Sequence, residues 1–192
     1  MRRRIAAVIA FGMAVVFLAG CTSADFRPPL CSDTGASIFV LEAQSVPSAT
    51  LLPCFTQLPV GWTYTGDYLI KDGLSRYFLD SDRAGVHAAE IELTPSCDIS
   101  GAVRMAAAPG EATITTSDKP LSLPPTFASV RFLQFPGGCV TERFKFSGGA
   151  LPSMALDVQE NLSFVRRQVI VDRVAATLDL RLCGAGAPPC AG

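Results

Sequence analysis

The sequence predicts an α+β domain, in which an antiparallel sheet of about five strands is covered on one face by a C-terminal helix or helix pair. Two observations indicate this class. Apolar and polar residues alternate in several segments between residues 62 and 146, and apolar residues recur every three or four positions from residue 151 onward. Cysteines in the body of the chain further predict that disulfides stabilise the domain.

The composition fits one folded domain and argues against two classes of protein. The chain has 192 residues, of which 49% are hydrophobic and 17% charged, with 16 Lys and Arg against 17 Asp and Glu. This apolar content argues against disorder, and the near-neutral charge argues against nucleic-acid binding, which needs a basic face for the phosphates. Nucleic acid is therefore not among the expected partners.

Residues 1–20 have the order of an export signal. Three arginines at positions 2–4 precede an uncharged run at positions 5–18. Such a run suits the central region of a signal peptide and is too short for a permanent helix across a bilayer core of about 30 Å.

The next feature is the tetrapeptide Leu18-Ala19-Gly20-Cys21, which resembles the lipobox of bacterial lipoproteins. The resemblance implies that the Cys21 thiol receives a diacylglyceryl group and that cleavage leaves Cys21 as the first residue. Acyl chains such as palmitate would then hold the protein at the cell membrane, facing the extracytoplasmic side. The alternative is an ordinary signal peptide whose cysteine joins a disulfide.

The expected mature chain is acidic. Removing residues 1–20 takes away three arginines and no acid, which leaves 13 Lys and Arg against 17 Asp and Glu, a net charge of −4. An acidic body does not itself bind an anionic membrane, so attachment depends on the lipid at Cys21. Residues 21–30 are expected to form a short polar tether, and residues 31–192 the single α+β domain.

Six cysteines remain besides Cys21, and an even number favours disulfides in an exported domain. No C-x-x-C motif occurs and His87 is the only histidine, which argues against a zinc site. The six are Cys31, Cys54, Cys97, Cys139, Cys183 and Cys190.

The layout of the predicted strands suggests one pairing among the 15 connectivities that six cysteines allow. Cys97 follows one strand and Cys139 opens another, so antiparallel neighbours would bring them together. The other expected pairs bracket the N-terminal element and the Gly- and Pro-rich C-terminal loop: Cys31 with Cys54, and Cys183 with Cys190.

Three alternating segments in succession predict a meander. Asp72-Gly73 is a strong signal for a two-residue hairpin turn of type I′, which needs positive φ at both positions. In the third segment Glu90 and Glu92 are expected to face water, while the apolar residues between them face a core. The segments are Trp62–Ile70, Leu74–Asp80 and Val86–Thr94.

A second hairpin is predicted from Phe127–Phe135 and Cys139–Phe146, joined around Pro136–Gly138. Between the two hairpins, residues Cys97–Pro125 show no sustained period. We expect a long crossing loop there, with one short strand near Ala112–Thr116.

Two segments outside the hairpins have ambiguous or helical patterns. Ile38–Leu41 fits a buried strand or a first helical turn, and Thr50 fits the N-cap of a short helix that ends at Pro59–Gly61. Near the C-terminus, apolar residues at helical spacing in 151–169 and again in 170–178 predict an amphipathic helix that bends or breaks near 164–166.

The search for catalytic and metal-binding motifs is negative. No G-x-S-x-G elbow, phosphate-binding loop or H-E-x-x-H helix occurs. Asp80–Gly85 begins like a calcium loop but lacks the third acid and the closing glutamate, so it is interpreted as a hairpin loop. We therefore predict no catalytic residue, no metal ligand and no cofactor.

Charged residues near His87 support two weaker hypotheses. His87 could be a general base with Asp80, Asp82 or Glu90 as its partner, but an exposed edge-strand histidine explains the pattern better. A charged sheet face could contact a ligand or partner, or could hold cross-strand ion pairs only. The residues expected on that face are Glu90, Glu92, Arg143 and Lys145.

The body of the chain resembles secreted or envelope proteins of high-GC Gram-positive actinobacteria that have no assigned activity. The resemblance lies in residues 77–85 (YFLDSDRAG) and 135–141 (FPGGCVT). It implies an envelope location and transfers no catalytic residue.

The expected function is that of a lipid-anchored extracytoplasmic envelope protein, a binding or accessory module without catalytic activity. Its expected partners are the membrane, through Cys21, and an envelope protein or small-molecule ligand. The alternatives are an envelope enzyme of unrecognised type and an assembly partner of a membrane complex. A large apolar pocket would favour ligand binding, a converging acid, base and nucleophile an enzyme, and an exposed apolar patch an assembly role.

Overall fold

The computed structural model describes residues 27–106, 113–123, 125–147 and 150–182. Cys21 and the expected export signal lie outside these residues. The described helices are α2 (Ser37–Ser45), α3 (Ser153–Asn161) and α4 (Arg167–Leu178). The strands are β1 (Leu51–Phe55), β2 (Trp62–Lys71), β3 (Leu74–Ser81), β4 (Gly85–Thr94), β5 (Val103–Arg104), β6 (Thr115–Ser122), β7 (Ala128–Phe135), β8 (Gly138–Lys145) and β9 (Leu162–Arg166).

Seven strands form one antiparallel sheet in the order β2-β3-β4-β8-β7-β6-β5, and β1 pairs with β9 in a separate two-stranded sheet. The predicted α+β class and antiparallel pairing are confirmed, but the main sheet has seven strands instead of about five. The additional strands β5 and β6 come from the segment expected to be a loop with one short strand near Ala112–Thr116; β6 overlaps that expected strand only at Thr115 and Thr116 and extends to Ser122. Most residues of β6 are polar and only partly covered, so the apolar alternation that identifies a half-buried strand is missing there.

Both predicted hairpins are present. The turn between β2 and β3 lies at Asp72-Gly73 as expected, but only Gly73 has positive φ, so the turn is not type I′. The turn between β7 and β8 packs closely on another loop: a Cβ added to Gly137, whose φ is 73°, would lie 1.9 Å from the carbonyl oxygen of Ser48. A side chain at this position would therefore collide with backbone.

The N-terminal segment differs from the expectation after Thr50. Ile38–Leu41 belongs to helix α2, one of the two predicted outcomes, but residues 51–55 form strand β1 instead of a helix. Pro53 is tolerated because a strand in a two-stranded sheet needs hydrogen bonds along one edge only. Thr50 therefore caps no helix, and its hydroxyl donates to the carbonyl oxygen of Pro136 at 2.8 Å.

The predicted C-terminal helix is interrupted by strand β9, which occupies the expected breakpoint and separates α3 from α4. Its residues Leu162–Arg166 include two with high β-propensity, Phe164 and Val165, and they pair with β1. Apolar residues at helical spacing could not reveal a strand whose partner lies about a hundred residues away. Of the apolar residues at helical spacing in 170–178, Ile170 and Val174 are buried as expected, whereas Leu178 is 60% exposed.

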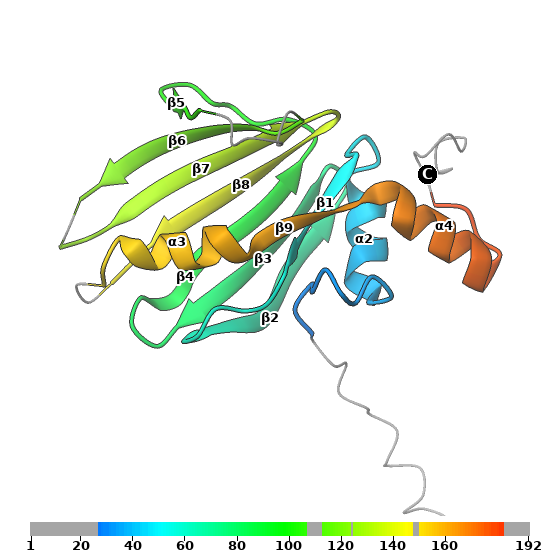
Figure 1. The fold of residues 1–192 in the computed structure, drawn as a ribbon, viewed down its shortest axis with the longest axis horizontal. Helices are drawn as coiled ribbons and strands as arrows, with labels where there is room; N and C mark the ends of the chain where they lie inside the picture. The colour runs from blue at the N-terminus through cyan, green and yellow to red at the C-terminus, as the bar shows by residue number, and fades with distance from the viewer. Residues whose placement is uncertain (1–26, 107–112, 124, 148–149, 183–192) are drawn as a thin grey trace, which may run out of the picture.

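The face of the main sheet that carries Leu79, Ile91 and Val140 forms the hydrophobic core and is called the inner face. Figure 1 shows α3 and β9 in front of the sheet, while α4 continues beyond them beside α2. The helices contribute buried side chains to the same core, among them Phe39 and Ile170. The opposite face of the sheet, called the outer face, carries the alternate residues of each strand.

Candidate functional site

Four charged residues form a network in the middle of the outer face. Arg76 on β3 lies 3.2 Å from Glu90 and donates to Glu92, and Arg143 on β8 lies 2.9 Å from Glu90 and 3.2 Å from Glu92. Cross-strand neighbours bring them together, because Arg76 faces Glu92 and Arg143 faces Glu90 in the strand register. Lys145, expected on this face, is exposed at the end of β8 and belongs to no ion pair among the described residues.

The network shields Glu92, which was expected to face water but is only 7% exposed. Burial raises the pKa of the Glu92 carboxyl, but the hydrogen bonds and charges of Arg76 and Arg143 outweigh it, so the pKa lies below its ordinary value. These paired charges fit the cross-strand interpretation of the charged face. They leave no unpaired acid at its centre.

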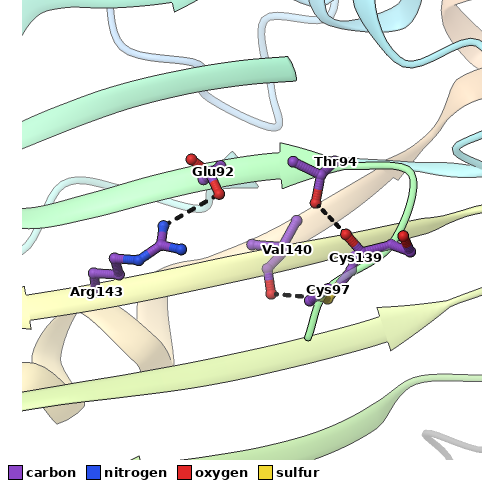
Figure 2. Close-up of a disulfide and its surroundings, with 7 residues drawn as sticks. Glu92, Thr94, Cys97, Cys139, Val140 and Arg143 are labelled. Atoms are coloured by element: carbon purple, nitrogen blue, oxygen red, sulfur yellow. Dashed lines mark hydrogen bonds and ion pairs between the residues drawn. A yellow bond between two sulfur atoms is a disulfide. The ribbon is translucent and has the colours of Figure 1, made fainter. Parts of the chain in front are cut away.

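A groove of about 280 Å³ lies next to this network, at the disulfide between Cys97 and Cys139 (Figure 2). Its floor includes Phe132, which packs in a small apolar cluster with Cys139. Its charged groups have internal partners: Lys119 donates to the carbonyl oxygen of Ser100 at 2.8 Å, and Arg143 pairs with Glu92. The charged side chains of the outer-face groove therefore already have hydrogen-bond or ion-pair partners within the fold.

His87 has the surroundings of a structural residue. Its ring stacks on Phe78, with 4.4 Å between ring centroids, its Nε2 lies 3.3 Å from Asp67, and its backbone N–H donates to Asp80 at 2.7 Å. Asp80 thus lies close, as the sequence suggested, but it binds the backbone of His87. Glu90, another suggested partner, is engaged in the charge network. Asp80–Gly85 lies at the β3–β4 hairpin, whose turn is formed by residues 82–84.

Two acids are buried on the inner side of the molecule. Glu42 on α2 accepts a hydrogen bond from Ser75 at 3.4 Å through Oε1, while its Oε2 and the Oε2 of Glu142 on β8 have no hydrogen-bond partner. Burial raises the pKa of the Glu42 carboxyl, against the lowering effect of Ser75. Burial also raises the pKa of Glu142 to about 8, although the neighbouring Arg131 lowers it. Burial therefore favours the protonated, uncharged form of both carboxyls.

A cavity of about 580 Å³ lies where α4 begins and is called the α4 cavity. Its walls are the α2–β1 connection with the first residue of β1, Thr113 before β6, the β7–β8 turn, and residues 166–168, where β9 runs into α4. Figure 1 shows this place, where β9 runs into α4 beside the start of β1. The apolar residues in its wall are Pro47, Ala49, Leu51 and Pro136.

Hydrogen bonds fix the walls of the α4 cavity to one another. Ser48 donates to the carbonyl oxygen of Gly137 at 2.6 Å, as Thr50 does to that of Pro136. The Arg167 N–H donates to the carbonyl oxygen of Thr50 at 2.9 Å. The cavity is thus formed by segments that the fold itself holds in place, as is usual for ligand sites.

The charge in the wall of the α4 cavity is positive. Arg166 and Arg167 line it, and no acid is among the described residues of its wall. Arg167 is 4% exposed, and burial lowers the pKa of its guanidinium. Arg166 is exposed, and its guanidinium forms no ion pair within the described part of the chain.

Two of the three expected disulfides are confirmed. Cys31 pairs with Cys54, with Cα atoms 5.1 Å apart, and Cys97 pairs with Cys139, with Cα atoms 5.8 Å apart. The third expected pair, Cys183 with Cys190, lies outside the described residues. The pairing of Cys97 followed from the sheet layout, since Cys139 faces Thr94 in the strand register and Cys97 comes just after it.

No sequence pattern predicts the α4 cavity, because its lining residues come from four segments that are distant along the chain. The adjacent arginines at 166 and 167 were the only unusual feature there. Comparison of the chain with protein-family models, curated proteins and solved structures found no match. Among the described helices, none has the length and apolar character needed to cross a membrane.

Proposed function

We propose that this protein is a lipid-anchored extracytoplasmic envelope protein that acts as a binding module without catalytic activity. The observation that carries the binding role is the α4 cavity, whose volume of about 580 Å³ lies in the range of about 300 to 1,000 Å³ common for small-molecule sites. Its apolar wall residues and nearby arginines match the usual composition of such sites. The lipobox-like Leu18-Ala19-Gly20-Cys21 supports the anchor.

The surroundings of His87 support the non-catalytic part of this proposal. A general base needs a nucleophile or substrate proton within hydrogen-bond reach. His87 instead contacts Asp67 and Phe78 on the sheet surface, away from the residues that line the α4 cavity. The extracytoplasmic location is supported by the disulfides Cys31–Cys54 and Cys97–Cys139, which persist in oxidising compartments.

An assembly role is the second candidate, and exposed apolar residues at the β5–β6 edge favour it. Val103, Leu121 and Leu123 are 66%, 57% and 74% exposed. Exposed apolar side chains at a sheet edge are typical of a surface that another protein covers.

The anchor is tested by replacing Cys21 with Ser and measuring the intact mass of the mature protein and its distribution between membrane and supernatant. We expect the unchanged protein to carry the lipid mass and to sediment with membranes, and the Cys21→Ser protein to do neither. Thr22→Ala, which leaves the cysteine in place, is the control. An unlipidated mature protein that begins at another residue would contradict the anchor.

The binding role is tested by photocrosslinking from the native membrane, with the photoreactive residue benzoylphenylalanine placed at Gln168 in the cavity wall or at Arg83 in the exposed β3–β4 turn. A small molecule or lipid captured at position 168 and not at position 83 is expected. With the photoreactive residue placed instead at Leu121 on the β5–β6 edge, capture of one defined protein, with no small molecule at position 168, would favour the assembly role.

A further inference from the structure

The α4 cavity combines an apolar wall with a positive end, and this combination defines a ligand class. We propose that the cavity binds an anionic amphiphile with a single apolar chain and a carboxylate head, with the carboxylate at Arg166 and the chain along Pro47, Leu51 and Pro136. This inference rests on the proposed binding function and names the chemistry of its ligand.

Arg166 is the charged group available to the ligand. It lies on the cavity wall, is exposed, and forms no ion pair among the described residues, so its guanidinium retains its five donors for a carboxylate. Arg167, in contrast, has a structural role. Its Nε and Nη2 donate to the carbonyl oxygen of Ala43 at 3.2 and 2.9 Å, which anchors α4 to α2 and sets the position of Arg166.

The start of α4 adds to the positive potential at the same place. The helix has twelve residues, no side-chain cap and no acid in its first turn. The first-turn N–H groups of Gln168 and Val169 have no acceptor within the helix, and the helix dipole favours an anion beside them. Gln168 lines the cavity, so the dipole and the Arg166 charge act on one ligand group.

The apolar wall excludes a small polar anion as the natural ligand. Pro47, Ala49, Leu51 and Pro136 offer carbon surface, which contributes binding free energy only when the ligand has apolar surface to bury. A sugar phosphate would lose hydration against these residues without gaining hydrogen bonds. A cavity of about 580 Å³ also suits one chain better than the two chains of a membrane phospholipid.

Binding of 11-(dansylamino)undecanoic acid, followed by dansyl fluorescence, tests the proposal with full-length Cys21→Ser protein. We expect saturable binding of the acid and at least about tenfold weaker binding of its neutral primary amide, because a hydrogen-bonded charge pair is lost. Arg166→Glu should weaken binding of the acid by a similar factor and leave the amide unaffected. Arg83→Glu, the same charge reversal in an exposed turn, should change neither.

The fold of each variant is checked by its unfolding midpoint, since Arg166 is exposed and a negative residue suits the start of a helix. Equal affinity for acid and amide, or equal affinity of the Arg166→Glu and Arg83→Glu proteins, would overturn the proposal. So would binding that appears only after residues 183–192 are removed, because the chain itself would then fill the cavity.

Two further measurements distinguish failure of the proposed ligand class from failure of the proposed binding function. Binding to phosphatidylglycerol vesicles without binding of the soluble acid would overturn the single-chain carboxylate. A different molecule crosslinked at position 168 from native membranes would also overturn it while leaving the proposed binding function intact. If no small molecule or lipid were crosslinked at position 168 from native membranes, the proposed binding function itself would be contradicted.

Discussion

The guanidinium of Arg167, at the start of α4, donates two hydrogen bonds to the carbonyl oxygen of Ala43 in the last turn of α2, at 3.2 and 2.9 Å. Helix C-termini leave carbonyl oxygens without intrahelical partners, and a cation beside them is favourable. The two residues are 124 positions apart in the chain. This contact therefore joins the N-terminal helix to the C-terminal helix across the core.

Replacing Arg167 with Ala should lower the free energy of unfolding by about 2 to 3 kcal/mol, because the buried carbonyl of Ala43 loses a charged donor and the arginine stem leaves a gap. Urea unfolding followed by circular dichroism measures this change. Arg166→Ala, which removes an exposed neighbour, should cost less than about 0.5 kcal/mol. Similar losses for both variants would show that the Ala43 contact is not the cause.

Glu142 gives the fold a dependence on pH. Burial raises its pKa to about 8 in the folded protein, against the opposing charge of Arg131, whereas the unfolded carboxyl titrates near its ordinary value of 4.5. Between these values the unfolded state releases the proton first, so the contribution of Glu142 to stability falls as pH rises from about 4.5 to 8 and then levels off. Glu142→Gln cannot release a proton and removes this contribution.

The expected result is that Glu142→Gln gains stability relative to the unchanged protein as pH rises, by on the order of 3 to 5 kcal/mol between pH 5 and pH 9. Urea unfolding of both proteins at several pH values gives the difference directly. Glu160→Gln, at an exposed position on α3, is the control and should show no such trend. Parallel stability curves for the Glu142→Gln and unchanged proteins would contradict the raised pKa.

The hairpins could be predicted because each depends on neighbours in the chain. In β4 the inward residues are apolar and the outward ones charged, so Leu93 and Glu92 identify the strand and its faces. The pairing of β1 with β9 could not be predicted in this way. Pro53 and Phe164 face each other in that register, and neither segment alternates strongly enough to exclude a helix. Long-range pairing decided the structure of both.

The candidate sites differ in the same way: features formed by predicted neighbouring strands could be anticipated from the sequence, and features formed by distant segments could not. The charge network was expected in part, since Glu90, Glu92 and Arg143 lie on neighbouring predicted strands, but the arrangement that buries Glu92 required Arg76 from the next strand. The α4 cavity depends on four segments that meet only in the folded chain. A sequence pattern records which residues face one side of an element, and it does not record which loops converge.

Glu92 should stabilise the fold in the opposite pH range from Glu142. Although burial raises the pKa of its carboxyl, Arg76 and Arg143 lower it below its ordinary value. A lowered folded-state pKa means that the stabilisation is present above about pH 4.5 and is lost as pH falls through the folded-state value. Glu92→Gln should therefore lower the stability at pH 7 by about 1 kcal/mol, after allowance for solvent screening.

This difference between Glu92→Gln and the unchanged protein should shrink as pH falls below about 4.5 and through the folded-state pKa of Glu92, because a protonated carboxyl no longer pairs with the arginines. Chemical unfolding at pH 7 and pH 3 measures it, with Asp82→Asn in the exposed β3–β4 turn as the control. A loss of the same size at both pH values would assign the effect to packing instead of to the ion pairs of Arg76 and Arg143.

The disulfide between Cys97 and Cys139 should contribute substantially to stability, because it closes a loop of 42 residues that includes β5, β6 and β7. Confining a loop of this length in the unfolded chain corresponds to about 3 to 4 kcal/mol in the chain-entropy account. Replacing both cysteines with Ala avoids leaving the buried Cys139 thiol unpaired and should lower the free energy of unfolding by that amount. Ser96→Ala is the matched control beside the bridge.

Peptide mapping of the unreduced protein supplies an independent measurement. It should link Cys97 to Cys139 and Cys31 to Cys54. Alkylation of the Cys21→Ser protein should find six thiols after reduction and none before. A peptide linking Cys139 to any other cysteine would refute the pairing, whatever the stability of the variant.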